Sequence, residues 1–162
     1  MSKTTVTTQL DDPLKSKQVE RITAVHKGFL YQHLYGVACL LTVISEPEAR
    51  LIVEHDEDLE LRLNGRSPYI QVKLRNRPLR YGDISGSIDQ FQDIRAEHAA
   101  GKRAGTPELR IVTNAVLGAG LAALNVSEDW PQDVRIVSPG DDSEDFPPSW
   151  SNVDEAITWC VE

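Results

Sequence analysis

The chain has 162 residues and a mass of 18.1 kDa, which is the size of one globular domain. Its composition, 40% hydrophobic and 26% charged, excludes global disorder and collagen-like repeats. No apolar run reaches the about 18 residues of a membrane helix, and the N-terminus lacks the apolar core of a signal peptide. The two cysteines, Cys39 and Cys160, lack the CxxC spacing of a zinc site. A reduced, cytoplasmic location is therefore expected.

The net charge of −8 argues against a nucleic-acid partner, but the charge is unevenly distributed. Residues 128–162 contain ten acidic residues and a single basic one, whereas residues 1–127 carry a net charge of +1. The segment 61–82 has no acidic residue and six basic ones: Arg62, Arg66, Lys73, Arg75, Arg77 and Arg80. This basic segment keeps nucleic acid among the candidate partners.

The first 20 residues are polar and are expected to form a loose arm. In residues 19–44, apolar side chains recur every three or four positions, which predicts a helix. Gly28 is expected to divide it into a lead-in and a main helix that begins near Phe29. Pro47 disfavours helical geometry at the residue before it and ends the helix.

Three strands are predicted next, at residues 50–54, 59–63 and 69–74, and the Asn64–Gly65 pair between the last two is a strong hairpin-turn signal. The rest of the chain predicts a helix, a strand, a short helix and a strand, in that order, at residues 84–100, 109–113, 117–124 and 134–137. We expect an α/β fold with a mixed central sheet flanked by helices. The core domain is expected over 21–137, followed by an acidic segment, 138–162, that leads to a further domain.

The three-strand segment brings together residues suited to one kind of chemistry. Gln71 and Lys73 share a face of their strand because side chains alternate along it, and the neighbouring strand can place Asp58 beside them. Carboxylate and amide oxygens can hold Mg²⁺ while most of its waters remain. The metal can polarise a phosphoryl oxygen, and a lysine can orient the attacking water or stabilise negative charge. These residues suit metal-assisted hydrolysis of a phosphodiester.

The Asp58 … Gln71–Val72–Lys73 pattern on consecutive strands after a helix resembles the PD-(D/E)XK nuclease superfamily in its Q-x-K variant. With the Gly28–Gln32 segment (GFLYQ) and Glu54 added, the chain is similar to the DUF4297 (Cap4-like) nuclease domains of bacterial anti-phage systems. The resemblance covers residues 27–75 well, and residues up to 137 only in the order of strands and helices.

The resemblance implies a restriction-endonuclease-like fold and metal-dependent cleavage of double-stranded DNA. Asp58 would be the metal-binding acid, Gln71 the second ligand and Lys73 the catalytic lysine, with Gln32 and Glu54 in support. The cofactor would be Mg²⁺ or Mn²⁺. The chain departs from the more frequent pattern at Gln71, whose amide holds a metal less strongly than a carboxylate does. The expected role is the effector of a defence system, working with a sensor or assembly domain or as a homo-oligomer.

Other interpretations remain open from the sequence. Glu54, Asp56, Asp58 and Glu60 would share one face of an unbroken strand, so more than one acid is a candidate metal ligand. Arg75, Arg77 and Arg80 are expected to contact DNA phosphates, but they also fit a solvated loop. The alternative function is a catalytically inactive nuclease fold used for protein–protein assembly. Cleavage of RNA is a third possibility, although no aromatic platform for single strands is evident.

Overall fold

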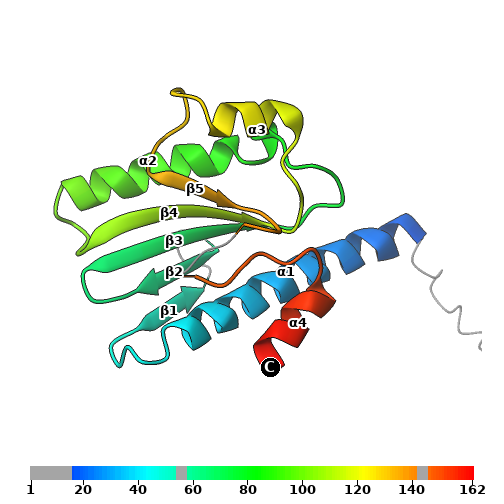
Figure 1. Ribbon diagram of the computed structural model, residues 1–162, viewed down its shortest axis with the longest axis horizontal. Helices are drawn as coiled ribbons and strands as arrows, with labels where there is room; N and C mark the ends of the chain where they lie inside the picture. The colour runs from blue at the N-terminus through cyan, green and yellow to red at the C-terminus, as the bar shows by residue number, and fades with distance from the viewer. Residues whose placement is uncertain (1–15, 54–57, 142–145) are drawn as a thin grey trace, which may run out of the picture.

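A computed structural model describes residues 16–53, 58–141 and 146–162 (Figure 1). A single mixed sheet in the order β1-β2-β3-β4-β5 has helices on both faces. The strands are β1 (Arg50–Val53), β2 (Leu59–Arg62), β3 (Arg66–Lys73), β4 (Thr106–Thr113) and β5 (Val134–Val137). The helices are α1 (Ser16–Thr42), α2 (Ser85–Ala99), α3 (Ala119–Asn125) and α4 (Val153–Val161), with a short 3₁₀ turn at Tyr81–Asp83. The expected α/β class with a mixed sheet is confirmed.

The connections between strands determine their directions. β1, β2 and β3 form an antiparallel meander, because only a few residues of chain connect each strand to the next. The turn between β2 and β3 contains Gly65 at φ +79°, a backbone conformation that glycine adopts without the cost of a Cβ clash. The connection from β3 to β4 runs through α2, which makes these strands parallel, and β5 is parallel to β4. β3 and β4 pair over eight residues and form the centre of the sheet.

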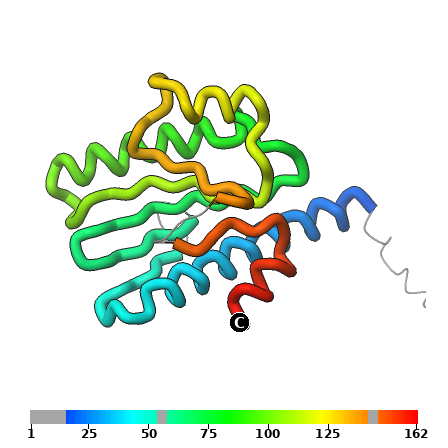
Figure 2. The backbone as a smooth tube through the Cα atoms, viewed as in Figure 1, coloured from blue at the N-terminus to red at the C-terminus, as the bar shows by residue number. Residues whose placement is uncertain are grey.

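Two apolar cores lie on opposite faces of the sheet. One is formed by α1, α4 and the even-numbered residues of β3 and β4, among them Ile70 and Val112. The other is formed beneath α2 and α3 by residues that include Tyr69, Phe91 and Ile111. The tube in Figure 2 shows α1 and α4 on one side of the sheet and α2 and α3 on the other. Side chains of β3 therefore alternate between these two cores.

The ends of the chain differ most from the sequence-based expectation. α1 already begins at Ser16, inside the expected arm, and continues through Gly28 without a break. The segment 138–162 does not simply leave the domain, because Ser149 and Trp150 are buried and α4 packs along α1. Asn152 starts α4, since its side chain accepts a hydrogen bond from the backbone N–H of Glu155 at 2.9 Å. Across the described residues, none of the helices is both long and apolar enough to cross a membrane.

Candidate functional site

Gln71 and Lys73 lie near the C-terminal end of β3, and both belong to its α2-facing side. Val72 and Leu74, between and after them, pack against the opposite core, so alternation places the two polar side chains together. For Gln71 the contact is direct: Ser87 of α2 donates a hydrogen bond from Oγ to Gln71 Oε1 at 3.1 Å. Gln71 is buried and Lys73 is half-buried, so the lysine lies at the margin of the covered surface.

Asp58 immediately precedes β2 and is half-buried. The register between β2 and β3, with Leu59 opposite Ile70, places Asp58 opposite Gln71 when it is continued by one residue. Strand pairing is not continued there. Instead, the Asp58 carboxylate Oδ2 accepts a hydrogen bond from the backbone N–H of Val72 at 2.7 Å. The Asp58 carboxylate thereby lies at the segment of β3 that carries Gln71 and Lys73, where β2 and β3 separate.

Of the two expected supporting residues, Gln32 and Glu54, only Gln32 lies among the described residues. Gln32 of α1 is buried and donates a hydrogen bond from Nε2 to the backbone carbonyl of Asp58 at 3.0 Å, so it holds the segment that carries the acid. Tyr31, its neighbour, is a core residue with no exposed surface. Glu54 and Asp56 lie outside the described residues.

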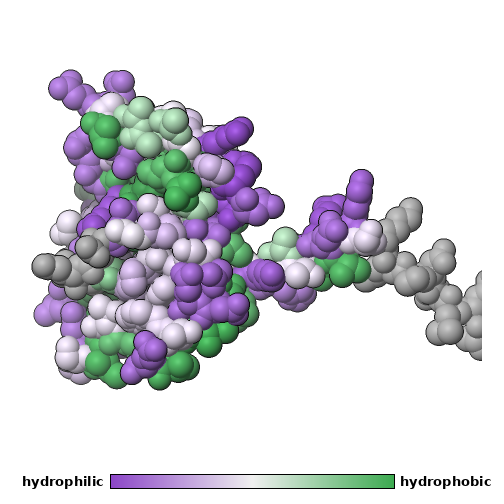
Figure 3. Space-filling model, turned by 45° about the vertical axis from the view of Figure 1, so that its right-hand side comes forward, coloured by the Kyte–Doolittle hydropathy of each residue, from purple (hydrophilic) through white to green (hydrophobic). Residues whose placement is uncertain are grey.

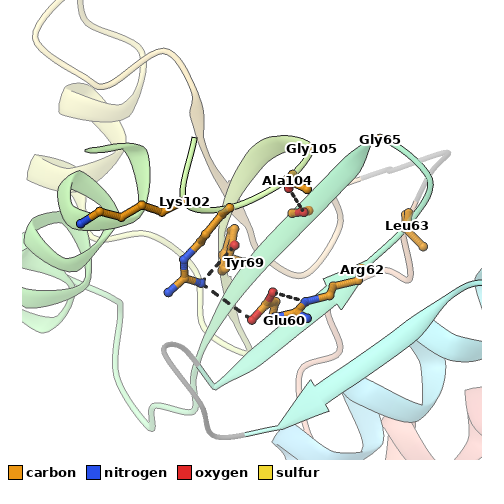
Figure 4. A pocket seen from close by; sticks show the side chains of 10 residues that line it. Glu60, Arg62, Leu63, Gly65, Tyr69, Lys102, Ala104 and Gly105 are labelled. Atoms are coloured by element: carbon orange, nitrogen blue, oxygen red, sulfur yellow. Dashed lines mark hydrogen bonds and ion pairs between the residues drawn. The ribbon is translucent and has the colours of Figure 1, made fainter. Parts of the chain in front are cut away.

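Glu60 shares the face of Asp58 but has a different environment, a cavity of about 270 Å³ (Figure 4). Its carboxylate is only 2% exposed and lies 2.7 Å from Arg62 Nε and 3.9 Å from Arg103 NH1. Arg103 also pairs with Glu97 and donates to the hydroxyl of Tyr69 at 3.2 Å. Glu60 and Glu97 together neutralise Arg62 and Arg103, so the Glu60 carboxylate is part of an ion-pair network. Among the described acids of the 54–60 run, Asp58 is the one beside Gln71.

The donor set at Asp58 and Gln71 fits a hard cation that keeps much of its water. It offers a carboxylate and an amide oxygen, and Mg²⁺ is commonly bound through one or two carboxylates plus waters. Each group already makes one hydrogen bond, but a carboxylate has about four lone-pair positions and an amide oxygen has two. Within residues 16–53, 58–141 and 146–162, no cluster of three or more His, Cys, Asp or Glu side chains suits a metal.

The arginines after β3 form an ordered turn. Arg77 donates two hydrogen bonds to the Asp83 carboxylate, at 2.8 and 2.7 Å, and Arg75 Nε lies 3.6 Å from it. The Arg77 hydrogen bonds and the backbone N–H of Arg80 lower the pKa of Asp83 to about 2. The guanidinium of Arg77 is therefore engaged by a carboxylate, whereas the side chain of Arg80 is exposed.

Ser87 is the contact that sequence reasoning did not find. It lies in α2, 16 residues after Gln71, and it is 4% exposed. A serine after two small residues near a helix start is a common local feature, so no sequence signal links it to Gln71. Only the packing of α2 over β3 brings the two together.

No protein-family model, no curated protein and no solved structure matches the chain.

Proposed function

We propose that this chain is a metal-dependent endonuclease domain with a restriction-endonuclease-like fold that hydrolyses phosphodiester bonds of double-stranded DNA. The observation that carries the proposal is the hydrogen bond from the backbone of Val72, the residue between Gln71 and Lys73, to the Asp58 carboxylate where β2 and β3 separate. It is supported by the order of one helix, three antiparallel strands, a helix and a parallel strand, which the resemblance implies.

Each residue has a role that its position permits. Asp58 and Gln71 would hold Mg²⁺ or Mn²⁺ through their side-chain oxygens. The bound metal supplies a Lewis acid for the phosphoryl oxygen. Lys73, at the half-buried margin, would orient the attacking water or stabilise the negative charge that develops on the phosphate. Gln32 and Ser87 act through other residues, because they hold the Asp58 backbone and the Gln71 amide. They are positioning residues.

The biological setting in this proposal follows from the resemblance alone. Domains of the DUF4297 (Cap4-like) kind act as effectors in bacterial anti-phage defence, in the cytoplasm, and the same role is proposed here. A sensor or assembly domain would then control when the site cuts.

The second candidate function, an inactive module for assembly, is favoured by the hydrogen bonds that Asp58 and Gln71 already make. The hydrogen bonds of Asp58 to Val72 and of Gln71 to Ser87 are also what a purely structural polar pair would make. In that case the fold is an inactive module for protein–protein assembly.

Cleavage of supercoiled plasmid by the full chain distinguishes the two functions. We expect nicking and linearisation with Mg²⁺ or Mn²⁺, and none with a chelator. Lys73→Ala should lower the rate about 10²–10³-fold, the typical loss for one electrostatic group. Lys102→Ala is the matched control, because Lys102 is an exposed lysine in the loop between α2 and β4. Equal rates for the parent and Lys73→Ala, or no metal-dependent cleavage, would favour the assembly module. Duplex RNA in place of DNA tests the nature of the substrate.

A further inference from the structure

The outer face of α1 is apolar and uncovered. Fifteen large hydrophobic side chains are exposed among the described residues, and nine of them belong to α1 or the turn that follows it. These nine, which we call the α1 stripe, are Val19, Ile22, Val25, Phe29, Leu30, Val37, Leu40, Leu41 and Ile44. Two more, Ile157 and Val161, lie on α4, which packs along α1. Large exposed apolar patches are rare on monomers and mark interaction surfaces.

The α1 stripe is distinct from the side of α1 that packs on the sheet. The buried side is formed by Tyr31, Tyr35, Ala38 and Cys39. Every member of the stripe has another member three, four or seven residues away, and His26 and His33 lie on the same side between them, so the stripe follows one side of the helix. A helix with a second apolar side along its whole length is typical of helix–helix pairing.

The first half of α1 has no covering structure among the described residues. Residues 16–27 are exposed all around, and Figure 3 shows this part of the helix standing clear of the rest of the molecule. Helical stability in proteins comes mostly from the packing of an apolar face, and these turns pack against nothing among the described residues. A second helix alongside would cover the stripe and stabilise the projecting turns.

We propose that the α1 stripe is the interface of a two-fold homodimer in which α1 packs antiparallel against α1 of a second copy. Charge complementarity argues for this occupant. The start of α1 carries Lys17, Arg21 and Lys27 against Glu20, residues 28–45 carry no Asp, Glu, Lys or Arg, and Glu46 and Glu48 follow. Antiparallel pairing places the basic end of one copy beside the acidic end of the other.

A specific alignment follows from maximal overlap. With Val19 of one copy opposite Ile44 of the other, Ile22 lies opposite Leu41, and Lys17 lies opposite Glu46. A parallel pair would instead set Lys17 against Lys17 and Arg21 against Arg21. Two-fold antiparallel pairing also makes every contact twice, as an isologous interface requires.

The available area is sufficient for a modest dimer. A helix of 27 residues is about 40 Å long and about 10–12 Å across, so its outer side offers a footprint of about 450 Å² per copy. The total of about 900 Å² lies below the about 1,200 Å² of stable interfaces and is typical of weak, transient ones. Dissociation is therefore expected in the micromolar range rather than the nanomolar range.

Sedimentation velocity and light scattering of the full chain from about 5 to about 200 µM test the proposal. The mass should rise with concentration from one 18.1 kDa chain toward two. Ile22→Glu and Leu41→Glu should each keep the protein monomeric. Matched controls are Val116→Glu and Val126→Glu, which alter residues that are 63% and 84% exposed outside the stripe and should leave the dimer intact.

A stripe variant could stay monomeric only because it fails to fold. Exchanging the charges of an expected ion pair between the two copies tests the interface without this ambiguity. Lys17→Glu alone should weaken the dimer, and Lys17→Glu combined with Glu46→Lys should restore it. A parent that stays monomeric at the highest concentration overturns the proposal, as does a dimer that the stripe variants leave unchanged. Association that grows past two copies overturns it as well. Binding of the monomer to lipid vesicles through the stripe would assign the surface to a membrane instead.

Discussion

At the scale of single residues, Asp58 combines a structural and a proposed catalytic task. Its Oδ2 accepts a hydrogen bond from the backbone N–H of Val72, a residue of β3 that pairs with β4 but lies beyond the residues paired with β2. Its backbone carbonyl is held by Gln32 from α1. A carboxylate fixed in this way from both sides needs little reorganisation to bind a cation, because its position is already set.

Substitutions at Asp58 separate these two tasks. Asp58→Asn keeps an oxygen that can accept the Val72 N–H, so we expect a small change in the free energy of unfolding. Asp58→Ala leaves that N–H without its acceptor and should cost about 1–3 kcal/mol. Both variants should lower metal-dependent cleavage at least about 10²-fold. Urea unfolding and plasmid cleavage are the measurements, with exposed Asp89→Asn as the control. If Asp58→Asn cuts as fast as the parent, Asp58 is only a structural residue.

Gln71 offers a test of metal affinity. Gln71→Glu adds a negative charge at the proposed ligand, and the Ser87 hydroxyl can still donate to it. The Mg²⁺ concentration for half-maximal cleavage should therefore fall. Ser87→Ala removes the group that orients the amide, and this concentration should rise. A Mg²⁺ titration of cleavage at constant ionic strength measures both. If Gln71→Glu and Ser87→Ala are both active and need the same Mg²⁺ concentration as the parent for half-maximal cleavage, Gln71 is not a metal ligand.

At the scale of elements, local signals predicted the strands of the sheet well and their lengths less well. β1, β2 and β5 were predicted to within a residue, and the Asn64–Gly65 turn is present. β3 and β4 each begin three residues earlier than predicted, because Pro68 and Pro107 obscure strands that still pair across the sheet. α4 was not predicted as an element of the domain, because the acidic, proline-containing sequence before it is typical of a linker.

In the candidate site, too, the sequence predicted what depends on neighbouring residues and missed what depends on packing between distant elements. Alternation within one strand predicted that Gln71 and Lys73 share a face, since this depends only on neighbouring residues. The Ser87–Gln71 contact depends on which helix covers β3, and the Glu60–Arg103 pair depends on where the loop after that helix lies. The sequence contains no local signal for either.

Tyr31 links α1 to the segment before α4. Its hydroxyl donates to the carbonyl of Trp150 at 2.8 Å, accepts from the Trp150 N–H at 3.0 Å and contacts Ser149 Oγ at 3.0 Å. Tyr31→Phe leaves these buried backbone groups of Trp150 without a partner and should lower the free energy of unfolding by about 1–3 kcal/mol. Tyr35→Phe, which loses one hydrogen bond to the Pro147 carbonyl, is the matched variant and should cost less. Chemical denaturation measures both. If Tyr31→Phe has the same free energy of unfolding as the parent, packing alone holds α4 in place.

The turn after β3 has a pH dependence that follows from Asp83. Its pKa is about 2 in the folded chain, against an ordinary value of 3.8. The stability that it contributes is therefore fully present above pH 3.8 and is lost as the pH falls through about 2. The difference in Tm between the parent and Asp83→Asn should narrow over this interval. Exposed Asp89→Asn should show no such narrowing. A Tm difference that stays constant down to pH 2 would mean that the Arg77–Asp83 pair does not contribute.

At the scale of the whole molecule, the charge distribution constrains how DNA can approach. A chain with net charge −8 repels a polyanion unless basic residues face it locally. The basic side chains of residues 61–82 are divided between internal pairs and the surface. Arg62 and Arg77 are paired with carboxylates, whereas Arg80 is exposed at the turn that follows the strand of Gln71 and Lys73. Phosphate contacts are therefore expected from only part of the basic segment.

Arg77 and Arg80 form a matched pair for testing this orientation. We expect Arg80→Ala to weaken binding to a short duplex and to reduce the slope of log K against log salt by about 0.9, the value for one phosphate contact. Arg77→Ala should leave that slope unchanged, because its guanidinium is engaged by Asp83. Fluorescence anisotropy at several salt concentrations, with a chelator present to prevent cleavage, gives both slopes. The same slope as the parent in both variants would place the DNA away from residues 75–80. A reduced slope in Arg77→Ala would instead show that DNA displaces Asp83 from its arginine, so that the ion pair opens when the phosphate binds.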